Sequence, residues 1–122
     1  MADRLENYAS EGDFQSAVMT LADLYGWWVM HVTTSQKGQK HLTSTSLSGW
    51  PDLVLWKPGV GVLYRELKTN RGRLSGAQQT VLGSLTEAGQ DCAVWRPRDW
   101  ALIEQTLTGK LRPLRPTDEE TP

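Results

Sequence analysis

Two apolar runs in the middle of the 122-residue chain constrain the fold more than any other feature of the sequence. Residues 49–56 (GWPDLVLW) and 60–68 (VGVLYRELK) are rich in β-branched and aromatic side chains, as strands are. Lys57, Pro58 and Gly59 separate them, and this triplet favours a turn because proline presets φ and glycine accepts a positive φ. The two runs therefore predict a β-hairpin.

The chemistry expected of this hairpin depends on the direction of its charged side chains. Alternate side chains of a strand share a face, so Glu66 and Lys68 are expected on one face, about 7 Å apart along the chain. Asp52 stands near the start of the first run, and antiparallel pairing of the two runs would bring it next to Glu66. Two carboxylates beside a lysine predict a divalent-metal site with a cation next to it.

The same residues carry a resemblance to a known family. Pro51-Asp52, followed by Glu66-Leu67-Lys68, resembles the PD-(D/E)XK nuclease motif. Gly49 before the Pro-Asp and the string GRLSGAQ at residues 72–78 make the stretch similar to the VRR-NUC (virus-type replication-repair nuclease) branch of that superfamily. The resemblance covers roughly residues 11–100. It implies an α/β fold with a PD-(D/E)XK restriction-endonuclease-like core, in which a mixed β-sheet is flanked by α-helices.

The resemblance also implies roles for individual residues. Asp52, Glu66 and the backbone carbonyl of Leu67 would hold Mg²⁺ or Mn²⁺, since oxygen ligands without sulfur suit these hard ions. Lys68 would orient or help to deprotonate the attacking water and offset charge building on the phosphorane. Gln78 would reach the active site or a phosphate.

Two residues also have a purely local explanation. A glutamate on the first helix supports the metal in the resembling family, directly or through water, and Glu11 is the matching position. An acidic residue in a first helical turn is also what the helix dipole favours. Ser75 and Gln78 have the spacing of a capping box, in which Gln78 is the reciprocal partner of the cap. At the level of sequence both explanations stay open for Glu11 and for Gln78.

The other elements are predicted from apolar periodicity and from glycines at helix ends. They are a helix over residues 11–25, a strand over 27–32, a polar loop over 33–48, a helix over 76–88 with Ala77, Val81, Leu85 and Ala88 along its apolar side, a strand over 92–95 and a helix over 100–108. We expect one nuclease domain over residues 1–109. Residues 110–122 mix proline, charge and threonine and are predicted to be a disordered tail.

The distribution of charge indicates a polyanionic partner, although the formal net charge is -1. Between positions 37 and 73 the chain has seven basic residues and two acidic ones, Asp52 and Glu66. A basic centre around isolated carboxylates suits a phosphodiester whose hydrolysis needs metal. The predicted DNA-binding residues are Lys37, Lys40, Arg71, Arg73 and His31. The two lysines lie in the polar loop, which is either a substrate-gripping flap or a plain flexible insert.

Composition narrows the compartment and the class of protein. A single cysteine, Cys92, excludes an internal disulfide framework and a cysteine-based zinc site, and it fits a reducing environment. No apolar run approaches the roughly 18 residues of a membrane span. We expect a soluble protein without a membrane partner, in the cytoplasm of a bacterium or of a phage-infected host cell.

The leading hypothesis is a metal-dependent DNA endonuclease that is selective for branched DNA, is similar to Holliday-junction resolvases and acts as a homodimer. One alternative is a less selective nuclease that acts on ends, flaps or single strands. Another is a nucleic-acid-binding subunit without cleavage of its own, although such a module would need only the basic residues. Arg65 alternates with Glu66, so it is expected on the opposite face of the sheet, where the sequence gives it no role.

Overall fold

The structure is a computed structural model and describes residues 10–32 and 48–109. Its elements in chain order are α2 (Glu11–Leu24), β1 (Trp28–His31), β2 (Leu53–Lys57), β3 (Gly61–Leu67), α3 (Gly76–Glu87), β4 (Asp91–Trp95), the 3-10 helix η2 (Pro97–Asp99) and α4 (Trp100–Leu107). The three α-helices each end one residue before the predicted position, because Tyr25, Ala88 and Thr108 cap their helices rather than continue them. The predictions for residues 33–47, including Lys37 and Lys40, and for residues 110–122 lie outside the described residues.

The described strands form one mixed sheet in the order β1-β2-β3-β4. β1 and β3 both pair antiparallel with β2, whereas β4 pairs parallel with β3. The predicted hairpin is therefore present as β2 and β3, and α3 makes the crossover that a parallel connection needs. In its turn the Val60 N–H donates to the Lys57 carbonyl at 2.9 Å, and Gly59 has a φ of 82°. The predicted α/β fold with a mixed sheet and flanking helices is confirmed.

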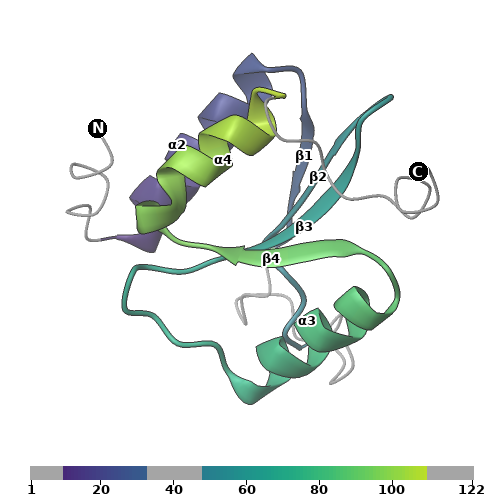
Figure 1. Ribbon diagram of the computed structural model, residues 1–122. Coiled ribbons are helices and arrows are strands. Elements are labelled where there is room, and N and C mark those ends of the chain that lie inside the picture. Colours follow the sequence, from purple (N-terminus) through teal and green to yellow (C-terminus); the bar gives the residue numbers. More distant parts are fainter. Residues whose placement is uncertain (1–9, 33–47, 110–122) are drawn as a thin grey trace.

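Helices cover the two faces of the sheet unequally. Figure 1 shows α2 and α4 together on one face and α3 on the opposite side, where it contacts β4. The main core lies between the sheet and the pair α2 and α4. Its buried members are Phe14, Val18, Ala22, Trp27, Leu53, Leu55, Leu63, Leu67, Trp95, Ile103 and Leu107. The spacing of Phe14, Val18 and Ala22 is four residues, which places all three on one side of α2.

Two apolar stripes differ from their predicted composition. The apolar residues at helical spacing in the predicted helix over residues 11–25 include Leu24 and Tyr25, and both are exposed. In α3 the buried residue is Leu82, and Ala77 and Ala88 are exposed. Val81 and Leu85 of the predicted apolar side are half-buried, so the inward side of α3 contains Gln78, Val81, Leu82 and Leu85. This rotation of α3 about its axis directs Gln78 toward the sheet.

Arg65 has a structural role that the sequence did not reveal. Its side chain is buried, and its Nη2 donates to the Asp91 carboxylate at 2.8 Å while Nη1 donates to the Asp91 carbonyl at 2.7 Å. The guanidinium also lies 4.8 Å from the centre of the Trp95 ring. Burial lowers the pKa of Arg65, and the charge of Asp91 opposes that shift. Arg65 therefore ties the beginning of β4 to β3, from the face opposite Glu66.

None of the helices in residues 10–32 and 48–109 has the length and apolar character that crossing a membrane requires.

Candidate active site

Asp52 joins the ends of the two central strands. It lies one residue before β2, and its Oδ2 accepts a hydrogen bond of 2.9 Å from the backbone N–H of Leu67, the last residue of β3. The pairing of Leu53 with Arg65, continued by one residue, places Asp52 opposite Glu66. The predicted meeting of these two carboxyl groups on one side of the sheet is therefore present in the structure.

Glu66 is a buried acid with too few hydrogen-bond donors. Its side chain is 2% exposed, and its Oε2 accepts from Gln78 Nε2 at 2.8 Å and lies 3.8 Å from Lys68 Nζ. Its Oε1 is buried, and none of the described residues offers it a donor. The pKa of Glu66 is raised to about 8, first by burial and then by the charge of Asp52 and a hydrogen bond to it, although Lys68 opposes the shift. Two acceptors that face each other need a proton or a cation between them.

Gln78 is held in one orientation by the cap of its own helix. Ser75 Oγ accepts from the Gln78 N–H at 3.1 Å, and Gln78 Oε1 accepts from the Ser75 N–H at 2.8 Å. Because the amide oxygen is occupied in this way, the amide nitrogen is the end that faces Glu66. The capping box and the contact with the site, which the sequence left as alternatives, coexist in one side chain.

Gly49 lets the chain before Asp52 pack directly against the start of α3. Its φ is 89°, and a Cβ at this position would stand 2.4 Å from the Ala77 carbonyl and 2.7 Å from the Gln78 nitrogen. Only glycine accepts both the positive φ and this approach of backbone to backbone. The first turn of α3, and Gln78 with it, is therefore fixed relative to the Pro51-Asp52 segment.

Glu11 lies at the margin of this group. The pKa of its carboxyl group is raised, mainly by burial and then by the charge of Asp52, while Lys68 lowers it. Glu11 is thus near enough to interact electrostatically with both residues. Within the described residues, however, the Asp, Glu, His and Cys side chains nowhere gather in a group of three or more that could hold a metal ion. We call Asp52 and Glu66 the paired acids. A cation bound there would be held by their two carboxylates, and main-chain oxygen and water would complete its coordination shell.

The basic loop after Lys68 is anchored by a residue that sequence reasoning missed. Arg96 donates from Nη1 to the carbonyls of Thr69 and Gly72, at 2.6 and 2.7 Å. The loop therefore has a defined path, from which Arg71 and Arg73 project as exposed side chains. No local signal in the sequence indicates this contact, because Arg96 is separated from its partners by 27 and 24 residues.

The predicted DNA contacts do not all lie on the same side of the sheet. His31 pairs with Leu53 in register, so alternation places its side chain on the face that carries Leu53, opposite that of Glu66. It is exposed there. Arg71 and Arg73 lie in the loop that follows β3, the strand that carries Glu66, so they are closer in the chain to the paired acids.

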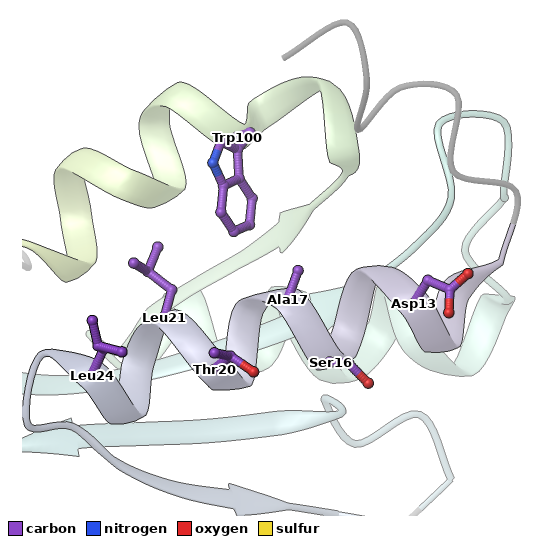
Figure 2. Close-up of a pocket in the computed structure, with 7 residues that line it drawn as sticks. All are labelled: Asp13, Ser16, Ala17, Thr20, Leu21, Leu24 and Trp100. Carbon is purple, nitrogen blue, oxygen red and sulfur yellow. The ribbon is translucent and has the colours of Figure 1, made fainter. Parts of the chain in front are cut away.

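A groove on the helical side of the molecule is separate from these residues. Figure 2 shows it between α2 and α4, with the Trp100 ring above α2. Its volume is about 760 Å³, and its lining residues are Asp13, Ser16, Ala17, Thr20, Leu21, Leu24 and Trp100. None of the predicted site residues lines the groove, so the paired acids, and not this hollow, remain the candidate active site.

A mixed sheet with Pro-Asp before one strand and Glu-x-Lys at the end of its neighbour is the arrangement of a PD-(D/E)XK nuclease. The model of the VRR-NUC domain matches residues 35–99, more than half of the sequence, and the chain belongs to this family. Among solved structures it is similar to a VRR_NUC domain protein, with 19% sequence identity, a TM-score of 0.58, and coverage of 80% of this chain and 87% of that one. At this identity the likeness shows the fold. A comparison with curated proteins finds no match. The predicted family is therefore confirmed, and membership implies a nuclease of the PD-(D/E)XK kind.

Proposed function

We propose that the protein is a Mg²⁺- or Mn²⁺-dependent deoxyribonuclease that cuts phosphodiester bonds in branched DNA and acts as a homodimer, as Holliday-junction resolvases do. The observation that carries the catalytic part is the meeting of Asp52 with a buried Glu66 whose Oε1 has no donor among the described residues. A buried, unsatisfied carboxylate oxygen is costly unless a ligand completes its environment. A hard divalent cation fits this need, since Mg²⁺ is commonly bound by one or two carboxylates together with water and phosphate oxygens.

The residues of the site have separate tasks in this proposal. Asp52, Glu66 and the Leu67 carbonyl would hold the cation, and Glu11 would support it directly or through water. Bound there, the metal would polarise the phosphate and lower the pKa of a water molecule. Gln78 keeps the Glu66 carboxylate in one orientation through the bond from its Nε2.

Lys68 would act on the water and on the phosphate. Its ammonium group lies 3.8 Å from Glu66 Oε2, which puts a positive charge at the edge of the paired acids. From there it would orient the attacking water and offset the negative charge that grows on phosphorus in the transition state.

Arg71 and Arg73 would bind the backbone of the DNA. Both are exposed on the loop that leads from β3 to the N-terminus of α3, where free backbone N–H groups also favour phosphate. His31, and Lys37 and Lys40 in the segment after it, stay predicted contacts on the same basis of charge. Phosphate contacts position a duplex without reading its sequence, which suits an enzyme that recognises shape.

The test is cleavage of four-way junction, flap, single-strand and linear duplex DNA with Mg²⁺ or Mn²⁺ by the wild type, Lys68→Met and Asp52→Asn. We expect either substitution to reduce cleavage by at least about a hundredfold while DNA binding changes little, because Lys68 would act on the transition state and Asp52 would hold the metal. Lys57→Met is the matched control, since Lys57 lies at the other end of β2 and bonds the Tyr25 carbonyl. Equal cleavage by all variants would reject the site, and wild-type binding without cutting would indicate a non-catalytic subunit. Light scattering tests the dimer.

A further inference from the structure

The sheet face that carries Glu66 continues into an uncovered aromatic surface. Trp28 pairs with Trp56, and Trp56 with Val62, so these side chains form one row across β1, β2 and β3. Alternation along β3 puts Val62 on the same face as Glu66. The Trp28 side chain is 62% exposed, and Met30 and Val62 are exposed too. We call Trp28, Met30, Trp56 and Val62 the aromatic surface.

The rings on this face have a definite arrangement. Trp28 and Trp56 are stacked, with centroids 6.3 Å apart and planes 8° from parallel. Between them and Glu66 lies Tyr64, against which Trp50 packs edge-on at 5.9 Å. From Val62 to Glu66 the strand advances by four residues, which is about 13 Å. Aromatic side chains therefore lie along this face of β3 from the paired acids to the aromatic surface.

The helices leave this surface open. Figure 1 shows α2 and α4 on the other face of the sheet and α3 beneath β4, away from the end of the β2–β3 hairpin. The charges nearby are compatible with a polyanion. β1, β2 and the first five residues of β3 contain no acidic residue that would repel a phosphate backbone. Glu11 of α2 lies near Asp52 and Lys68, at the end of the sheet that carries the paired acids.

We propose that Trp28 and Trp56 form a stacking platform for unpaired bases of the DNA strand whose phosphodiester bond lies at Asp52 and Glu66. The proposal rests on the nuclease function proposed above. It narrows the substrate class, within branched DNA, from fully paired four-way junctions to branches that carry a single-stranded arm. Aromatic rings bind any base through its π-face, without reading sequence. A duplex keeps those faces inside its own stack, so the platform distinguishes unpaired from paired DNA. The row of stacked indoles, on the same face as the acids and free of acidic neighbours, carries the argument.

The test measures binding of the full chain in EDTA, so that it does not depend on cleavage. The probes are an oligothymidylate of about ten nucleotides, within the site size of single-strand-binding folds, and a duplex of equal length. Trp28→Ala should weaken binding of the single strand by about tenfold and of the duplex by less than about twofold. Trp28→Phe keeps a ring and should restore most of the affinity. Leu24→Ala, at an exposed position on α2, is the matched control and should change neither.

The salt dependence separates stacking from charge. Stacking releases no counterions, so Trp28→Ala should leave the slope of log K against log salt unchanged, whereas Arg71→Ala should lower it by about one. The stacking platform would be overturned if Trp28→Ala lost equal affinity for the single strand and the duplex, or lost no affinity for the single strand. A Trp28→Ala protein of halved mass in light scattering would assign the surface to a second copy and likewise overturn it. Because binding is measured without metal, a protein that stacks single strands but never cuts would refute only the proposed nuclease function.

Discussion

Arg65 and Glu66 are neighbours in the chain, and both are buried charges, but the two faces of the sheet treat them differently. Arg65 meets an acid of opposite charge, Asp91, and the face of Trp95. Glu66 meets a second acid, Asp52, and retains an oxygen without a donor among the described residues. The fold itself neutralises the charge of Arg65. The charge of Glu66 needs a proton or a cation from solution.

The difference separates a structural charge from a functional one. A buried ion pair compensates the charge of Arg65 inside the fold, although Arg65 Nε, like Glu66 Oε1, is buried without a hydrogen-bond partner among the described residues. A carboxylate beside another carboxylate is unfavourable in the isolated protein and becomes favourable only with a proton or a cation. We therefore expect opposite effects on the stability of the metal-free protein when the charge of Arg65 and the charge of Glu66 are removed by substitution.

The largest effect should follow from Glu66→Gln. The amide keeps the shape of the side chain but removes the charge that would bind a metal, so cleavage should fall by at least about a hundredfold. The metal-free protein should at the same time become more stable at pH 8, because the repulsion from Asp52 is gone. Activity assays and urea unfolding measure the two changes. Glu87→Gln, at an exposed position on α3, is the control; a stability loss in Glu66→Gln would contradict the comparison.

Next in size is the pH dependence of the metal-free protein. In the folded state the pKa of Glu66 is about 8, whereas the unfolded chain loses this proton near its ordinary value of 4.5. The folded state thus binds more protons between these values, so its stability should fall as pH rises from 4.5 to 8, by on the order of a few kcal/mol. Added Mg²⁺ or Mn²⁺ should raise Tm more at pH 8 than at pH 5, since metal and proton compete. Equal metal effects at both pH values would argue against binding at Glu66.

Arg65→Met should act on stability and leave the chemistry in place. It leaves the Asp91 carboxylate without its arginine, and because the Asp91 side chain is 18% exposed we expect a loss of about 2 kcal/mol, below the range for fully buried pairs. For a domain of this size the corresponding fall in Tm is roughly 10 °C. Arg98→Met, at an exposed site, is the control. An unchanged Tm would show that the pair contributes no net stability.

The smallest effect tests how the site is held. Ser75→Ala removes the acceptor of the Gln78 N–H and should cost about 1 kcal/mol of stability. It also loosens the amide that faces Glu66, so kcat should fall while KM stays the same. Ser84→Ala, which removes a hydroxyl that bonds Val81 within the same helix, should leave kcat unchanged. An equal fall in kcat in Ser75→Ala and Ser84→Ala would assign the effect to the stability of α3 alone.

The predictions from sequence succeeded where neighbouring residues decide the outcome. The hairpin, the capping box of Ser75 and the helix ends follow from turn-forming residues and periodicity over a few positions. Asp52 and Glu66 were expected to meet because strand pairing fixes which side chains share a face. The apolar side of α3 was predicted in part: Val81 and Leu85 are half-buried, but Ala77 and Ala88 are exposed and Leu82 is the buried residue, since residues at helical spacing are compatible with more than one rotation of a helix on a sheet.

By itself the sequence determined the family, the mixed sheet and which acids and lysine lie together, because these depend on local pattern and pairing register. Only the tertiary structure decided the pairing of Arg65 with Asp91, the hold of Arg96 on the loop after Lys68 and the close approach of Gly49 to α3. Each joins atoms more than twenty residues apart. Such contacts are set by how whole elements pack, and the relative placement of two elements is a property of the complete core rather than of either segment.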